Sequence, residues 1–112
     1  MRAPFVLLAL AACANPGRLY TGPMVPEAPS AQCRPATATL TLRGDSAAFN
    51  PGEGAIYLSG LVEDNRLQAE RPTRGPGGAT LTTRVDARWD GRSATAEYVT
   101  PRCRYRAAML PR

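Results

Sequence analysis

The stretch ATLTTRVDARWDGRSATAEYV, residues 79–99, decides the fold class of this chain. Up to Trp89, apolar or small side chains at odd positions alternate with polar ones at even positions. A period of two is typical of a strand that buries one face. Asp90-Gly91 is then the strongest hairpin signal in the chain, and residues 93–99 return with the same alternation. The stretch therefore predicts two antiparallel strands joined by a tight turn.

The alternation continues on both sides of this hairpin. In residues 36–43, ATATLTLR, every even position is apolar and every odd position is polar. Gly and Pro, with 10 and 11 copies, punctuate the chain and leave no room for long helices. The sequence predicts an all-β fold, a small antiparallel meander of seven to eight strands forming a barrel or two-layer sandwich. The predicted strands are residues 36–43, 46–50, 55–63, 66–70, 79–89, 93–99 and 102–109, with a short eighth near residues 18–21 and the longest loop at residues 71–78.

Residues 1–17, MRAPFVLLALAACANPG, have the order of a secretory signal. A single positive charge at Arg2 precedes an apolar run, and small residues follow at the exit. The segment Leu10-Ala11-Ala12-Cys13 resembles the lipobox of bacterial lipoproteins, in which the cysteine thiol carries a diacylglyceryl thioether. The resemblance implies a signal peptide over residues 1–12 and a mature chain that begins at a lipidated Cys13, anchored by acyl chains such as palmitate.

The residue after Cys13 bears on the destination. An Asp there favours retention at the inner membrane of Gram-negative bacteria; here it is Ala14, so the resemblance implies the outer membrane, facing the periplasm. Ala12-Cys13-Ala14 also fits the rule of ordinary secretion, which would release a soluble periplasmic or secreted protein. We prefer lipidation, because a cysteine at this point of a leader otherwise has little reason to be there. Residues 13–32 are then the lipidated N-terminus and a Pro-rich tether, and residues 33–112 the β-domain.

Cys33 and Cys103 are the obvious disulfide pair in an oxidising compartment, once lipidation has used the third cysteine. Free reactive thiols and a metal site are the alternatives, although two Cys without His make a poor metal site. Aromatic residues are only 6% of the chain, so the core is small and a covalent staple is expected. Closing a loop of roughly 70 residues would stabilise the fold by about 4 kcal/mol.

The charged residues exclude several kinds of chemistry. All 14 basic residues are Arg, none is His, and the formal net charge is +5. Without His there is no Ser-His or Cys-His catalysis, no His metal ligand and no His pH switch. Glu53 and Glu63-Asp64 lie in predicted turns with no sign of a converging acid–base pair. We therefore expect no enzyme, no cofactor and no metal, and the phase of Trp89 places it in the core.

The last predicted strand places Arg102, Arg104 and Arg106 on one face, about 6–7 Å apart. Such a row suits phosphate or carboxylate groups of an envelope protein, lipopolysaccharide or peptidoglycan. The preferred interpretation is a solvated face whose Arg side chains pair with Glu97 or Asp86 on other strands. Nucleic acid is not an expected partner, given the compartment and the lack of exposed aromatic residues in this row.

The size, lipobox, strand-rich body and long-range disulfide are together similar to small periplasmic lipoproteins that inhibit C-type lysozyme with an eight-stranded barrel. The string Trp89-Asp90-Gly91-Arg92 is loosely similar to a Trp-x-Lys-Gly segment late in that family. The family's other motif, Ser-Gly followed by a basic residue and Tyr, is not present, because Leu61-Val62 follows Ser59-Gly60. We therefore expect a non-enzymatic, membrane-anchored periplasmic lipoprotein that binds or supports an envelope component, with lysozyme inhibition as the alternative function.

Overall fold

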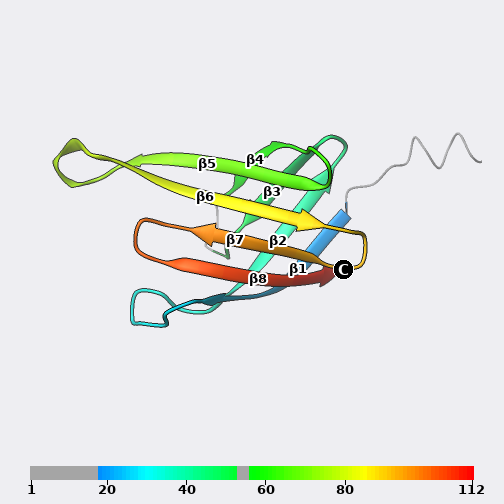
Figure 1. The fold of residues 1–112 in the computed structure, drawn as a ribbon, viewed down its shortest axis with the longest axis horizontal. Coiled ribbons are helices and arrows are strands. Elements are labelled where there is room, and N and C mark those ends of the chain that lie inside the picture. The colour runs from blue at the N-terminus through cyan, green and yellow to red at the C-terminus, as the bar shows by residue number, and fades with distance from the viewer. Residues whose placement is uncertain (1–17, 53–55) are drawn as a thin grey trace, which may run out of the picture.

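The fold is all-β, as the two-residue alternation predicts (Figure 1). The computed structural model describes residues 18–52 and 56–112. Its strands are β1 (Arg18–Pro26), β2 (Ala36–Arg43), β3 (Ser46–Asn50), β4 (Leu58–Leu61), β5 (Arg66–Arg74), β6 (Thr80–Trp89), β7 (Ala94–Val99) and β8 (Arg104–Pro111), with a single 3₁₀ turn, η1 (Pro76–Gly78), between β5 and β6. The leader, Cys13 and Glu53 lie outside the described residues.

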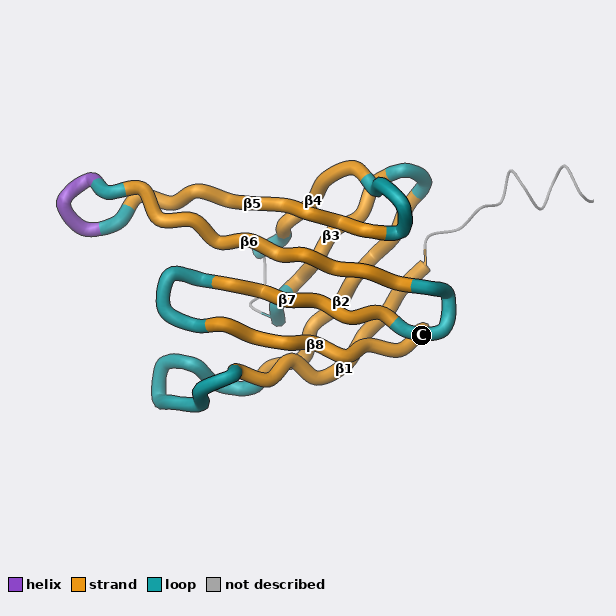
Figure 2. The backbone as a smooth tube through the Cα atoms, in the orientation of Figure 1, coloured by secondary structure: helices purple, strands orange, loops and turns teal. Residues whose placement is uncertain are grey.

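The eight strands form one antiparallel sheet in the order β4-β3-β2-β1-β8-β7-β6-β5. Consecutive strands are paired except β4 with β5, and the first and last strands, β1 and β8, pair with each other, for example Met24 with Ala107. The open seam is between β4 and β5, which a tight turn joins and where the Glu63 amide donates to the Arg66 carbonyl over 3.1 Å. The meander is therefore a nearly closed barrel. Figure 2 shows its backbone as a tube, with the strands in orange.

The interior is filled by the side chains that the alternation turns inward. Phe49, Leu40 and Leu67 are fully buried, and Trp89 is only 8% exposed, so its predicted core position is confirmed. Most other members of the core are small, because the strands of a narrow barrel leave little space between them. The buried core residues of the strands are Tyr20, Met24, Ala38, Leu40, Ala47, Phe49, Leu58, Leu67, Ala69, Val85, Ala87, Trp89, Ala94, Ala96, Tyr98, Tyr105, Ala107 and Met109.

The hairpin turns lie where turn residues predict them. Asp64 and Asn65 both have positive φ, 53° and 57°, as a type I′ turn requires. In the β6–β7 turn the Asp90 amide donates to the Ser93 carbonyl, and the positive φ, 89°, belongs to Gly91. The two central residues of the turn are therefore Gly91-Arg92 and not Asp90-Gly91. The Asp90 carboxylate accepts the backbone N–H groups of Arg92 and Ser93, and these bonds hold its pKa below the ordinary value.

One boundary of the sequence analysis is wrong. The short strand predicted near residues 18–21 is present, but it has nine residues, runs to Pro26 and lies between β2 and β8, so the sheet begins at Arg18 and not at Cys33. Pro23 argues against a central strand because it has no N–H to donate. In the structure the β1–β8 ladder pairs Thr21 with Leu110 and resumes at Met24, so Pro23 falls in the gap.

Three other predicted segments differ in length. β5 continues to Arg74, so the predicted loop at residues 71–78 shrinks to residues 75–79; Pro72 is tolerated because β5 is the edge of the sheet. The strand predicted at residues 55–63 is only Leu58–Leu61 within the described residues. The last strand begins at Arg104, because residues 100–103 form a turn in which the Thr100 amide donates to the Cys103 carbonyl over 2.8 Å.

The outer half of the β5–β6 hairpin extends beyond the barrel (Figure 1). We call residues 70–83 the arm. Every side chain from Glu70 to Arg74 is exposed, and only Leu81, Thr83 and Gly75 are half-buried on this segment. The arm is thus a two-stranded ribbon with solvent on most sides, and it points to the same end as the β7–β8 turn.

Candidate functional site

The structure separates the three Arg residues of the predicted row. Arg104 and Arg106 lie on the outer face of β8, whereas Arg102 lies in the β7–β8 turn. The Arg104 guanidinium lies 3.2 Å from the Glu97 carboxylate, as the solvated-face interpretation anticipates, and that of Arg106 lies 3.5 Å from Glu27. A continuous row of free cations is therefore the wrong description, since two of the three have carboxylate partners.

A shallow groove crosses the outer face of β1, β8, β7 and β6 and has a volume of about 710 Å³. Small residues, among them Ala108, form its floor, and charged residues of both signs form its rim. On β6, Asp86 accepts two hydrogen bonds from Arg66, at 2.9 and 2.6 Å, and these bonds lower the pKa of its carboxyl group. The groove is thus lined by balanced charges and favours neither anions nor cations.

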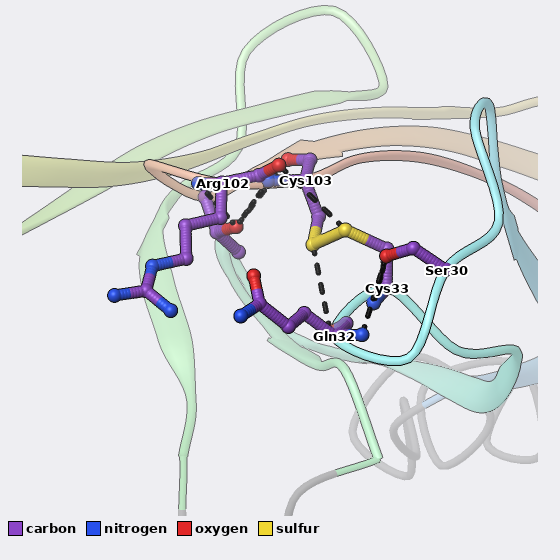
Figure 3. The surroundings of a disulfide bond; sticks show 6 residues. Ser30, Gln32, Cys33, Arg102 and Cys103 are labelled. Atoms are coloured by element: carbon purple, nitrogen blue, oxygen red, sulfur yellow. Dashed lines mark hydrogen bonds between the residues drawn. A yellow bond between two sulfur atoms is a disulfide. The ribbon is translucent and has the colours of Figure 1, made fainter.

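The Cys33–Cys103 disulfide, predicted from the cysteine count, lies at the opposite end of β1 from Arg18. It connects the β1–β2 loop to the β7–β8 turn, and Figure 3 shows both cysteines in compact turns. Ser30 Oγ accepts the backbone N–H of Cys33 at 3.1 Å, and Thr100 Oγ1 accepts that of Cys103 at 2.9 Å. A hydroxyl residue three positions before each cysteine is therefore the local signal for these two turns.

A second hollow, of about 370 Å³, opens beside this disulfide; we call it the mouth. Tyr98 and Tyr105 form part of its wall, with ring centroids 5.9 Å apart, and Phe49 continues the stack behind Tyr98 at 5.6 Å. Arg34 and Arg102 are the charged residues on it. Its described lining is Met24, Gln32, Arg34, Ala36, Pro51, Leu81, Tyr98, Thr100, Pro101, Arg102, Cys103 and Tyr105, a set without a carboxylate.

Sequence reasoning identifies Arg102 but misses the mouth as a whole. Its residues come from β1, the β1–β2 loop, β2, the β3–β4 connection, β6, β7, the β7–β8 turn and β8. No short motif links them, because only closure of the barrel brings these loops to one end. The available signal was the hydroxyl residue three positions before each cysteine. It predicts that Cys33 and Cys103, and with them the neighbouring Arg34 and Arg102, lie in turns and not in strands.

Charge is distributed unevenly between the two ends of the barrel. Four carboxylates, those of Asp45, Glu63, Asp64 and Asp90, lie in the turns at the end where β1 begins. At the disulfide end, Glu70 is the one described carboxylate outside an ion pair. The Arg residues at that end without an ion pair among the described residues are Arg34, Arg71, Arg74, Arg84 and Arg102. The disulfide end is therefore the more positive one.

Across residues 18–52 and 56–112, no three His, Cys, Asp or Glu side chains are grouped in a way that would hold a metal ion. Within the same ranges, no helix has the length and apolar character needed to cross a membrane. The segment Gly75–Gly78, which lacks the Lys of a phosphate loop, is the turn of the arm.

Comparison with protein-family models, curated proteins and solved structures finds no match to this chain.

Proposed function

We propose that this chain is a lipid-anchored envelope protein without catalytic activity, held at the periplasmic face of the outer membrane through Cys13. In this proposal the barrel is a rigid binding module for an envelope component. The lipobox resemblance of the leader motivates the anchor. The observation that favours a binding role is the arrangement of the barrel, which separates an end with four turn carboxylates, where β1 begins, from the end with the mouth and its Arg residues.

The short distance along the chain between anchor and barrel supports this arrangement. Cys13 is five residues before Arg18, the first residue of β1, and five extended residues span at most about 18 Å. The barrel is therefore held close to the membrane. Because β1 runs from Arg18 toward the β1–β2 loop, the mouth lies at the opposite end of the barrel from Arg18, and the arm points to that end as well (Figure 1).

Cys13→Ser tests the anchor directly. We expect cells that produce the natural chain to incorporate labelled palmitate into it and to retain it in the outer-membrane fraction. The Cys13→Ser chain should incorporate none and leave that fraction. Asn15→Ala is the matched control, because it changes a neighbouring residue without removing the thiol, and it should label normally. Labelling of Cys13→Ser, or absence of labelling in the natural chain, would reject the proposed anchor.

Lysozyme inhibition is the second candidate, and the arm is the feature that favours it. A narrow two-stranded ribbon with a Gly-rich tip has a shape that can enter an enzyme's cleft. Under this proposal, the purified protein slows a C-type lysozyme at near-stoichiometric ratios. Glu70 and Arg84 are paired across β5 and β6, so Asn-Gly inserted between them can replace the arm's outer residues 71–83. Inhibition that persists without the arm would exclude this mode of action, and no inhibition would exclude the function.

A further inference from the structure

The mouth combines an apolar wall with uncompensated positive charge. Tyr98, Tyr105 and Leu81 line it, so a ligand can bury an apolar group there. The guanidinium groups of Arg34 and Arg102 lie on the same hollow, and neither forms an ion pair with a described residue. Both side chains are exposed beside the apolar wall, so an anion bound at the mouth would meet two positive charges and no carboxylate of the described lining.

The two turns beside the mouth are held by hydroxyl groups of Ser30 and Thr100, and not by the side chains of Arg34 and Arg102. The polar backbone groups beside Arg102 are satisfied by Thr100, whose hydroxyl accepts the N–H groups of Arg102 and Cys103 at 3.3 and 2.9 Å. Ser30 serves Gln32 and Cys33 in the same way, at 3.2 and 3.1 Å. Figure 3 shows that the side chains of Arg102 and Gln32 extend to the same side of the disulfide. Their polar ends are therefore left for other partners.

The outer-face groove provides a useful contrast. There Asp86 and Glu97 lie on the same lining as Arg88 and Arg106, so a bound anion would face carboxylates as well as guanidinium groups. At the mouth no described lining residue is acidic, and the positive charges of the arm add to the attraction for an anion. Of the mouth and the outer-face groove, the mouth has the chemistry better suited to a negative ligand.

We propose that the mouth binds a ligand that joins a phosphate or carboxylate group to an apolar group. Arg34 and Arg102 bind the anion, because guanidinium groups match the geometry of both kinds of oxygen acid. Tyr98 and Tyr105 contact the apolar group, and the disulfide keeps the two turns in place before binding. This inference deepens the proposed binding role and rests on it, since it names the ligand chemistry and the residues involved.

The test uses the full chain, purified in detergent from the cells that produce it, and isothermal titration calorimetry. Phenyl phosphate and hippurate are the probes, because each joins an aromatic ring to an anion. Inorganic phosphate and phenol are the two halves of the first probe, and acetate and benzamide those of the second. We expect a complete probe to bind more tightly than either half. A preference for phenyl phosphate indicates a phosphate ester as the natural ligand, and a preference for hippurate indicates a carboxylate.

Arg34→Gln combined with Arg102→Gln should weaken binding of the preferred probe at least about ten-fold, the loss expected for charge-assisted hydrogen bonds. Both side chains are exposed, so these changes leave the core intact. Arg43→Gln is the matched control, since Arg43 is exposed at the other end of the barrel, and it should bind like the natural protein. Equal affinity of the double variant, or no binding of either probe, would overturn the inference. Palmitate labelling is independent of these outcomes, so failure of the anchor and failure of the ligand site are distinguishable.

Discussion

The Cα atoms of Cys33 and Cys103 lie 5.7 Å apart, although 70 residues separate the two cysteines in the sequence. Their bond connects the β1–β2 loop to the β7–β8 turn, beside the β1–β8 pairing that closes the barrel. The same two loops also form part of the lining of the mouth. One covalent link therefore stabilises both the closure of the sheet and the candidate binding site.

Replacing both cysteines, Cys33→Ser with Cys103→Ser, should lower the free energy of unfolding by about 4 kcal/mol, because the open chain gains the entropy of a loop of roughly 70 residues. Urea unfolding followed by tryptophan fluorescence measures the loss, since Trp89 is buried in the natural fold. Addition of reductant should destabilise the natural protein by a similar amount and leave the double variant unchanged. A natural protein that is indifferent to reductant would contradict this prediction.

Gly22→Ala should destabilise the barrel by about 3 kcal/mol or more, because a methyl group there overpacks the junction of β1 and β8. A Cβ atom on Gly22 would lie 2.8 Å from the Cα atom of Met109 and closer still to the Ala108 carbonyl, and neither backbone can yield without separating the strands. Gly60→Ala is the control. Its Cβ would contact Leu67 at 3.4 Å, which is an ordinary distance, so its cost should stay within about 1 kcal/mol. Equal effects in thermal unfolding would show that the β1–β8 junction is looser than described.

Tyr20→Phe should stabilise the protein by about 1 kcal/mol, because it removes a buried hydroxyl that lacks a partner. Tyr20 is 1% exposed, and its hydroxyl oxygen has no hydrogen-bond partner among the described residues. Tyr57→Phe is the matched control at a position 53% exposed, where water satisfies the hydroxyl group, and it should change stability little. A Tyr20→Phe protein that unfolds at lower urea than the natural one would show that the hydroxyl does have a partner.

The Arg66–Asp86 pair should make a pH-dependent contribution to stability. The two hydrogen bonds from Arg66 lower the pKa of Asp86 from its ordinary value of 3.8, with smaller help from the charges of Arg66 and Arg88 and opposition from partial burial. A lowered pKa in the folded state stabilises the protein fully above that ordinary value, and the contribution is lost as the pH falls through the lowered one. A double-mutant cycle of Arg66→Gln and Asp86→Asn should therefore show coupling at pH 7 that fades in acid. Coupling that does not change with pH would contradict the prediction.

Local pattern was sufficient wherever a strand has one buried face and a turn has a distinctive residue. The even positions of ATATLTLR, and Val85, Ala87 and Trp89 of the later strand, point inward as predicted, because a two-residue period fixes the face of every side chain once one is buried. The positive φ angles of Asp64 and Asn65 follow from the residue types themselves. Burial of Ala94, Ala96 and Tyr98 follows from the same period.

Local pattern failed where a strand depends on a distant neighbour. The sequence predicts only a short strand near residues 18–21 and a Pro-rich tether up to residue 32, yet pairing with β2 and β8 extends that strand to Pro26 and makes it the one that closes the barrel. Arg71 and Pro72 look like a loop, yet pairing with β6 extends β5 through them. Hydrogen bonds from a partner strand outweighed weak local preference in both cases.

By itself, the sequence determined the all-β class, the inward faces, most turns and the cysteine pair, because these follow from periodicity, turn stereochemistry and cysteine number. Only the tertiary structure decided that β1 and β8 are neighbours, that Arg104 and Arg106 have carboxylate partners, and that Arg34 and Arg102 share the mouth. These relationships join residues far apart in the chain. They exist only when the sheet has curled and closed, and no local preference encodes which distant loops then lie side by side.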